Sequence, residues 1–215
     1  MKILILAASP RKKGNTNALV SAFCEVLDKN TYDVVNLYDL QIEPCLACRH
    51  CQRDWEQPNC VRQDDLSKDL FSKILQADLI VLATPVYAWF CTAPAKALLD
   101  RCVYALNKYY GVPEDDAANE ANASEHGDAG NEDAKAERRR GPSIWAGKRM
   151  ALITTCGYPP EKGADLLEEG IRRYCKHSGL KYAGMLCERH MGYDVPFMDE
   201  DKAARAKAFA RELLE

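Results

Sequence analysis

Unbroken apolar runs alternate along this chain with stretches whose apolar residues recur at helical spacing. Asp-Leu-Ile-Val-Leu-Ala at 78–83 and Met-Ala-Leu-Ile-Thr at 150–154 are typical of central parallel strands covered on both faces. Asp-Val-Val-Asn-Leu-Tyr at 33–38 is mixed, as in an edge strand. The pattern predicts strands at 2–8, 33–38, 78–83, 148–155 and 181–188, and helices at 16–28, 65–76, 94–109, 163–177 and 199–214.

A helix after each of five strands, with right-handed crossovers, predicts an α/β fold. We expect a three-layer sandwich around a parallel sheet of strand order 2-1-3-4-5. Ligands of such sheets bind beyond the carboxyl ends of the strands. The loops to inspect are therefore 9–15, 84–92 and 156–162.

The first of these loops has the composition of a phosphate site. It opens a helix, whose free N–H groups attract anions, and Gly14 is its only glycine. The pyrophosphate fingerprint G-x-G-x-x-G and the Walker pattern are therefore absent. Binding of the terminal phosphate of a mononucleotide by side chains fits the loop better. The alternative is an ordinary helix-capping turn with solvated lysines. The candidate phosphate ligands are Ser9, Arg11, Asn15, Thr16 and Asn17.

The other two loops supply candidates for binding a planar ring. Tyr87 and Trp89 follow the third strand and could stack on a ring or lie along its edge, and peptide groups of this proline-constrained loop could bond its polar rim. Packing on a helix or on another subunit is the alternative. In the third loop, Gly157 permits close backbone approach, while Cys156 either lies near the ring or is a small buried residue.

A cysteine-rich loop spans residues 45–60. Cys45, Cys48 and Cys51 form a Cys-x2-Cys-x2-Cys run that suits three corners of a cuboidal 4Fe-4S cluster, with Cys60 as a fourth ligand. Free thiols and zinc remain alternatives, although structural zinc usually takes two separate knuckles. Because the loop follows the second strand, we expect it at the same sheet edge as the phosphate loop. We interpret the other cysteines, Cys24, Cys91, Cys102, Cys175 and Cys187, as core residues.

Composition limits the class of protein. The 215 residues suit one domain, 1–215, and the net charge of −3 argues against a general nucleic-acid binder. No apolar stretch is long enough for a membrane span, and 3–8 is too short for an export signal, so we expect a cytoplasmic location without membrane association. Residues 113–140 are rich in carboxylates and lack large apolar side chains, which predicts a disordered insertion.

Three motifs carry a family resemblance: Ser-Pro-Arg-x-x-Gly-Asn-Thr from residue 9, Pro-Val-Tyr from residue 85 and Thr-Cys-Gly from residue 155. The chain resembles the NADPH-dependent FMN reductase group of flavodoxin-like proteins, and within it the iron-sulfur flavoproteins, because of the cysteine run and Cys60. This resemblance implies FMN as cofactor and a homodimer or homotetramer with the flavin near a subunit interface. It also implies that the five residues of the first loop bind the phosphate and that the ring is surrounded by Pro85, Val86, Tyr87, Thr155 and Gly157. The gap from Cys51 to Cys60 is longer than these relatives usually have.

These observations predict an FMN-dependent oxidoreductase that passes electrons between a reduced carrier, ferredoxin or NAD(P)H, and a small-molecule acceptor. The chemistry takes place on the flavin, so no catalytic side chain is predicted. Arginines around the cysteines could attract an acidic carrier. The alternatives are a cluster-free NAD(P)H-dependent flavin or quinone reductase and a non-enzymatic redox shuttle or sensor.

Overall fold

The computed structural model describes residues 1–108, 141–192 and 194–215, which form a parallel sheet flanked by helices. Its strands are ordered β2-β1-β3-β4-β5, and every neighbouring pair runs parallel. The predicted flavodoxin-like fold class and strand order are thereby confirmed. The strands are β1 (Ile3–Ala7), β2 (Tyr32–Asn36), β3 (Leu79–Pro85), β4 (Arg149–Cys156) and β5 (Lys181–Arg189).

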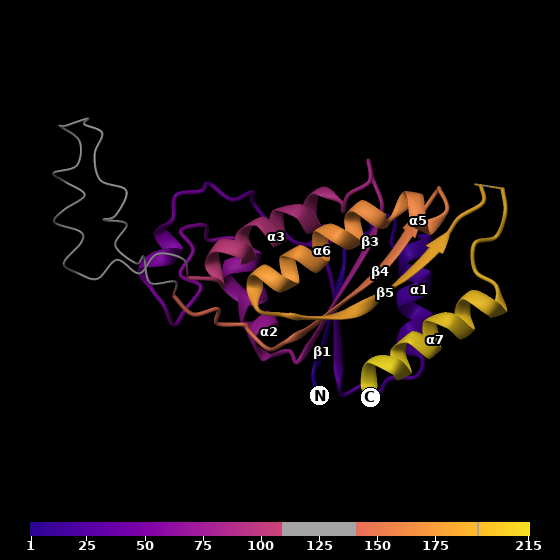
Figure 1. Cartoon of the computed structure of the whole chain (residues 1–215), viewed down its shortest axis with the longest axis horizontal. Coiled ribbons are helices and arrows are strands. Elements are labelled where there is room, and N and C mark those ends of the chain that lie inside the picture. The colour runs from indigo at the N-terminus through magenta and orange to yellow at the C-terminus, as the bar shows by residue number, and fades with distance from the viewer. Residues whose placement is uncertain (109–140, 193) are drawn as a thin grey trace, which may run out of the picture.

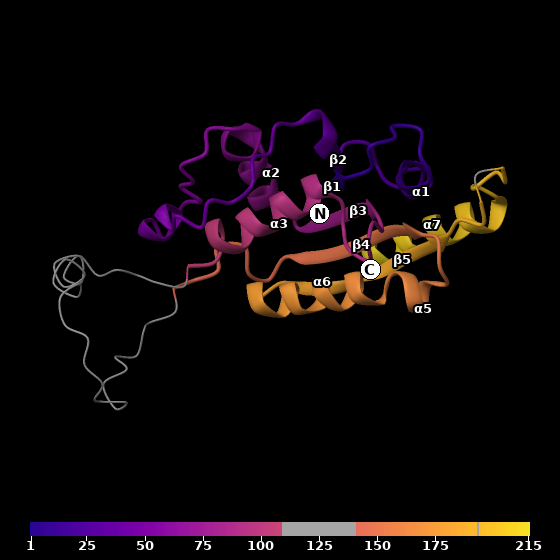
Figure 2. The same cartoon turned by 90° about the horizontal axis from the view of Figure 1, so that it is seen from above.

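Helices cover both faces of the sheet (Figures 1 and 2). They are α1 (Asn15–Cys24), α2 (Phe71–Gln76), α3 (Ala93–Ala105), α5 (Pro160–Gly163), α6 (Asp165–Ser178) and α7 (Glu200–Leu214). Alternate residues of each central strand enter opposite cores. Leu4 and Leu6 pack with α2, α3 and α6, whereas Ile3 and Ile5 pack with α1 and α7. Because both faces are buried, β1 is wholly apolar, and β3 and β4 contain unbroken apolar runs at 79–83 and 150–153.

Several element ends differ from the predicted ones, and the helix predicted at 94–109 already ends at Ala105. The first helix ends at Cys24 and not at 28, because Glu25 and Leu27 donate backbone bonds three residues back and Asp28 accepts the amide of Asn30 in a tight turn. The helix predicted at 65–76 begins with a wide π turn over Leu66–Leu70. The short helix α5 was not expected. β2 lies at the sheet edge, as its mixed pattern predicted.

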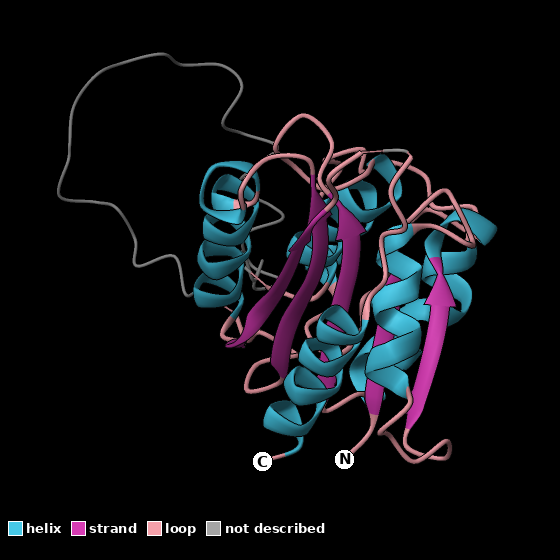
Figure 3. Cartoon of the chain, turned by 90° about the vertical axis from the view of Figure 1, so that its right-hand side faces the viewer, coloured by secondary structure: helices cyan, strands magenta, loops and turns pink. Residues whose placement is uncertain are grey.

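The strands end together at one edge of the sheet, and their following loops gather there (Figure 3). The predicted insertion 113–140 lies outside the described residues. Among the helices of the described ranges, none is both long and apolar enough to span a membrane.

Candidate functional site

A pocket of about 350 Å³ opens at the carboxyl ends of β1, β3 and β4. This volume falls in the range of roughly 300 to 1,000 Å³ that is common for small-molecule sites. Eight of the twelve predicted cofactor-binding residues line it: Ser9, Arg11, Asn15, Thr16, Pro85, Val86, Tyr87 and Thr155. The fold therefore brings together the phosphate candidates of the first loop and the ring candidates of the other two.

The first turn of α1 forms one wall of this pocket. Its N-cap residue is Gly14, so no side chain caps the helix, and the first-turn residues Asn15 and Thr16 line the pocket. A Cβ at Gly14 would lie 2.9 Å from the carbonyl oxygen of Arg11, which is too close for any other residue. The glycine thus permits the tight turn that places Arg11 beside a helix start, an arrangement that suits an anion.

Buried hydroxyl groups connect the two halves of the pocket. Thr16 Oγ1 and Thr155 Oγ1 lie 2.8 Å apart, joining the start of α1 to the end of β4, and both residues are almost fully buried. Asn17 does not line the pocket. Its Nδ2 donates to the carbonyl oxygens of Arg11 at 3.1 Å and Lys12 at 3.2 Å, so it supports the shape of the loop.

The aromatic loop after β3 makes a two-residue turn. Tyr87 and Phe90 exchange both backbone hydrogen bonds at 2.9 Å, and the central residues, Ala88 and Trp89, have φ values of 49° and 66°. Such conformations are strained in residues other than glycine and cluster at functional sites. The amide of Val86 donates to the carbonyl of Thr155 at 2.8 Å. The amides of Val86 and Tyr87 therefore already have partners, and a ring edge would need other donors.

Three more predicted residues lie outside the pocket lining. Trp89 stacks on Tyr158 with ring centroids 6.1 Å apart, and its indole nitrogen donates to the carbonyl of Lys162 at 3.2 Å. Gly157 lies under His190, whose Nε2 would be 3.4 Å from a Cβ at that position. Cys156 is buried next to the pocket residue Thr155.

Cys156 forms a thiol pair with Cys187 on the neighbouring strand, with the two sulfurs 3.5 Å apart. The hydrogen bond from Cys187 lowers the pKa of Cys156 against the effect of burial. The same bond, together with burial, raises the pKa of Cys187. All ten cysteines of the chain are free thiols. Cys102 and Cys175 are fully buried as predicted, whereas Cys24, Cys91 and Cys187 are half-buried.

The segment after β5 supplies pocket residues that were not predicted, namely His190, Gly192 and Val195. The backbone amide of His190 donates to the carbonyl of Cys156 at 3.0 Å, which continues the β4–β5 pairing past the end of the strand. The sequence did contain a signal for these residues. Because β5 ends at the same sheet edge as the other strands, the loop that follows it is also expected to lie at the ligand-binding edge.

All four cysteines of the 45–60 loop line a second, much smaller hollow of about 20 Å³. Left-handed residues directly precede two of them: Ala47 before Cys48, and Asn59 before Cys60. Among the described residues, no three His, Cys, Asp or Glu side chains converge closely enough for a single metal ion. Thiols placed around a hollow suit the corners of a cuboidal cluster in donor chemistry, but the loop must open to admit one.

The expected position of this loop is wrong. Its hollow is lined by Arg101, Tyr104 and Ala105 from the second half of α3, whereas the pocket of about 350 Å³ is lined by Tyr87 and other residues outside α3. The chain leaves β2 at the predicted edge but then runs along α3 toward the opposite end of the sheet (Figures 1 and 2). Two loops that follow parallel strands share an edge only near their starts.

A buried lysine holds the cysteine loop in this place. Lys108 is 1% exposed, and its Nζ donates to the carbonyl oxygens of Cys51 at 2.8 Å, Gln57 at 2.8 Å and Ala105 at 2.7 Å. Burial lowers the pKa of Lys108. Gln52 adds bonds from Nε2 to the carbonyls of Tyr104 and Asn107 at the end of α3. These polar contacts fix the loop together with Cys51 and Cys60, which pack in or against the apolar core.

Comparisons with known proteins identify the family and the fold of the chain. The sequence profile of the family described as NADPH-dependent FMN reductase matches residues 1–120. An iron-sulfur flavoprotein of Methanosarcina thermophila is 34% identical over 114 residues, covering 52% of this chain and 58% of that protein. One from Methanocaldococcus jannaschii is 32% identical over 103 residues, covering 47% and 51%. The matches thus span about half the length of these curated relatives.

Two solved structures show the same fold. The NAD(P)H:quinone oxidoreductase of Methanothermobacter marburgensis aligns over 100% of this chain and 98% of its own, with a TM-score of 0.65 and 20% identity. The Trp repressor binding protein of Bacillus subtilis aligns over 97% of both chains, with a TM-score of 0.57 and 15% identity. At these identities the likeness concerns the fold alone.

Proposed function

The chain belongs to the family of NADPH-dependent FMN reductases, and from this premise we propose that it is an FMN-dependent oxidoreductase of the iron-sulfur flavoprotein type. It would pass electrons between a reduced carrier and a small-molecule acceptor. The observation that carries the proposal is the pocket of about 350 Å³, in which eight predicted cofactor residues from three separate loops meet at the start of α1.

The phosphate group of FMN would occupy the α1 end of the pocket. Arg11 supplies a guanidinium fork, Ser9 and Thr16 supply hydroxyl groups, and the uncapped first turn supplies backbone N–H donors. Asn17 would act indirectly, by holding the carbonyls of Arg11 and Lys12. A single phosphate is favoured because the loop has one glycine, which is used for a turn and not for approach to a pyrophosphate.

The ring of FMN would lie between the β3 and β4 loops, and FMN supplies the redox chemistry when it is bound. Pro85 and Val86 would provide an apolar wall, and the half-exposed Tyr87 would shield the ring from water. Thr155 offers a hydroxyl already oriented by Thr16, while His190 offers a polar group at the far side. Cys156, Gly157 and Trp89 would support this wall from outside the pocket.

For the second cofactor we propose a 4Fe-4S cluster ligated by Cys45, Cys48, Cys51 and Cys60. The names of the curated relatives and the four thiols around one hollow support it. Thiolate is the ligand that iron-sulfur clusters require. A cluster would favour a one-electron carrier such as ferredoxin as the donor, with NAD(P)H as the alternative.

The positions of the two sites favour assembly of several copies. A rise of 1.5 Å per residue places Arg101, beside the cysteine hollow, about 12 Å along α3 from its first residue, which follows the flavin loop. A neighbouring copy could shorten that path. The exposed aromatic residues Tyr87, Trp89, Phe90 and Tyr158 at the pocket rim are candidates for such a contact. We propose a homodimer or homotetramer, to be measured by light scattering.

A cluster-free NAD(P)H-dependent quinone reductase is the second candidate function. It is favoured by the family profile and by the small volume of the hollow, about 20 Å³. A redox shuttle or sensor, which turns over no donor, is the third. All three functions place FMN in the same pocket. They differ in whether the cysteine loop holds a cluster and in whether the protein turns over a donor.

One preparation distinguishes these functions. Protein purified without oxygen and reconstituted with iron and sulfide is assayed for FMN, iron and acid-labile sulfide, then for turnover of NADPH, NADH or reduced ferredoxin with a quinone. We expect FMN, cluster and turnover. FMN and turnover without sulfide would establish the simple reductase, and FMN without turnover would favour the shuttle or sensor.

Serine variants locate the cluster. Cys45→Ser, Cys48→Ser and Cys51→Ser should each lose iron and sulfide but retain FMN, because alkoxide is a poor substitute for thiolate on iron. Cys24→Ser, on α1 and outside the loop, is the matched control and should keep both cofactors. Unchanged sulfide in the loop variants would remove these cysteines as ligands.

A further inference from the structure

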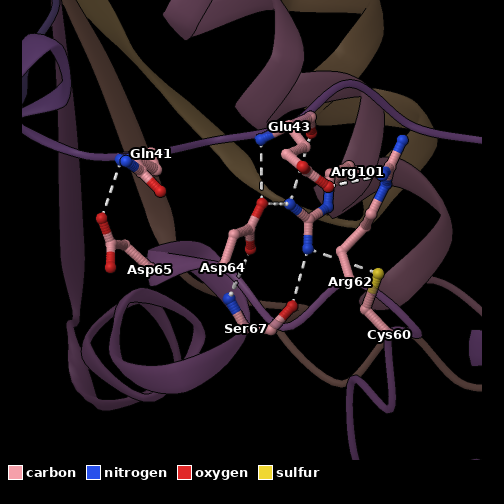
Figure 4. Close-up of polar contacts among 8 residues, drawn as sticks. All are labelled: Gln41, Glu43, Cys60, Arg62, Asp64, Asp65, Ser67 and Arg101. Carbon is pink, nitrogen blue, oxygen red and sulfur yellow. Dashed lines mark hydrogen bonds and ion pairs between the residues drawn. The ribbon is translucent and has the colours of Figure 1, made fainter.

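A buried guanidinium lies against the last of the four clustered cysteines. Arg101 belongs to α3 and is 2% exposed, and its Nη2 donates to the sulfur of Cys60 at 3.3 Å (Figure 4). The two residues are 41 positions apart in the sequence. This contact is thus a tertiary connection between the helix and the end of the cysteine loop.

The orientation of this guanidinium is fixed by several other groups. Its Nη1 pairs with the carboxylate of Asp64 and approaches the carbonyl oxygen of Glu43 at 3.3 Å, and its Nη2 also donates to Ser67 Oγ at 2.6 Å (Figure 4). Asp64 is held in turn, because Oδ2 accepts the amide of Glu43 at 2.8 Å and Oδ1 accepts the amide of Ser67 at 3.2 Å. The fork can therefore rotate very little.

This arrangement explains how Cys60 can be placed despite its distance from the cysteine run. Cys45, Cys48 and Cys51 are positioned by one compact segment, but eight residues separate Cys51 from Cys60. The residue before Cys60, Asn59, is left-handed with φ of 40°, which turns the chain just before the contact with Arg101. The side chain of Cys60 consequently takes its position from α3 and not from its neighbours in sequence.

We infer that Arg101 is the positioning residue that makes Cys60 the fourth ligand of the cluster. The inference rests on the cluster proposed above. Cys60 would bind iron through its sulfur, with its proton released to solvent, and the N–H···S bond from the fixed guanidinium would hold that sulfur in the position from which it faces the cluster. No electron is transferred in this step.

The geometry predicts that lysine cannot replace this arginine. Lysine can still pair with Asp64, but a single ammonium cannot also span Cys60 and Ser67 in the fixed plane of a guanidinium. Arg101→Lys therefore keeps the buried charge paired and removes the hold on the thiol. Lys96→Gln is the matched control, because Lys96 is on the same helix and forms only an exposed pair with Asp100.

The experiment compares anaerobically reconstituted parent, Arg101→Lys, Cys60→Ala and Lys96→Gln for iron, sulfide, FMN and electron paramagnetic resonance after mild oxidation. We expect Arg101→Lys to match Cys60→Ala. Both should lose about a quarter of the iron and show the signal of a three-iron cluster, which an oxidised four-iron cluster does not give. Lys96→Gln should match the parent.

The outcomes distinguish a failure of the proposed role of Arg101 from a failure of the cluster proposal. A parent with a four-iron cluster and an Arg101→Lys variant with the same cluster would overturn the role of Arg101 and leave the proposed function intact. A parent that takes up no cluster would remove the cluster proposal and this inference with it. Unchanged FMN content shows that a variant is folded. Should Arg101→Lys lose FMN, Ser67→Ala replaces it, since it frees one side of the fork and should partly reproduce the iron loss.

Discussion

The flavin-sized pocket and the cysteine loop are built in opposite ways. The pocket loop is stabilised by short-range contacts, such as those of Gly14 and Asn17 with the carbonyl of Arg11. The cysteine loop is held by long-range contacts to α3 and to the segment that follows it, from which Lys108 donates to the carbonyl of Cys51, 57 residues earlier. Local chemistry therefore describes the first region well, while the second depends on tertiary contacts.

This difference determines how each region should respond to mutation. A change in the pocket loop should alter ligand affinity more than overall stability, because few buried groups depend on it. A change at a buried cation of α3 should affect stability strongly, because several polar groups lose their partner together. Changes in the two regions are expected to add, since they share no partner.

The largest effect is expected for Lys108→Met. The substitution leaves the carbonyl oxygens of Cys51, Gln57 and Ala105 without their donor. We expect the free energy of unfolding in urea to fall by about 3 to 5 kcal/mol. Lys96→Met, at an exposed position of α3, should change it by less than about 0.5 kcal/mol. Similar results for the two variants would show that Lys108 does not anchor the loop.

Asp64→Asn should be the next most destabilising, and its effect should depend on pH. Burial opposes the charged form, but hydrogen bonds from Arg101 and two backbone amides lower the pKa of Asp64 below its usual range. The stabilisation is therefore complete above about pH 4 and is lost as the pH falls through the folded-state pKa. We expect a loss of about 2 to 3 kcal/mol at pH 7 that shrinks in acid. A difference independent of pH in urea titrations would contradict the ion pair.

Gly14→Ala should strain the pocket loop. Its Cβ would lie 2.9 Å from the carbonyl oxygen and 3.0 Å from the Cβ of Arg11. We expect a loss of about 1 to 3 kcal/mol of stability together with weaker FMN binding. Gly170→Ala in α6 is the control, since nothing lies within 4 Å, and it should stabilise the protein by about 0.5 to 1 kcal/mol. Equal thermal shifts for the two variants would refute a tight turn.

The smallest effect is expected for Lys12→Ala. Lys12 pairs with Asp39 at the surface, and both side chains are at least half exposed. Such pairs contribute about 0 to 1 kcal/mol. FMN affinity measured by fluorescence quenching should therefore change by less than about fivefold. A loss as large as that of Arg11→Ala would add Lys12 to the phosphate site.

The sheet and most of the pocket lining could be predicted from the sequence, for a physical reason. Buried parallel strands have continuous apolar runs, as in β1 and β3, and the loops that follow them meet at one edge. The same rule failed for the cysteine loop, because a long connection can travel away from its strand. The rule also applies to the loop after β5, which was not among the predicted loops and contributes His190 to the pocket.

The roles of Arg101 and Lys108 could not be deduced from sequence. Arg101 lies within α3 and Lys108 follows the end of that helix, and charged residues are usually exposed. Apart from Ala105, the hydrogen-bond partners named above lie 34 to 58 positions away, so only the folded structure brings them together. Likewise, the pairing of the Tyr87 amide with Phe90 depends on a backbone turn that the aromatic composition did not indicate.

The central claim, that the pocket holds FMN by its single phosphate, is tested most directly by calorimetric titration of the apoprotein with FMN and with riboflavin. The parent should bind FMN more tightly than riboflavin. Arg11→Ala should weaken FMN binding by about 1.5 to 3 kcal/mol, or one to two decades in Kd, and leave riboflavin binding unchanged. Equal affinity of the parent for the two flavins would contradict the account.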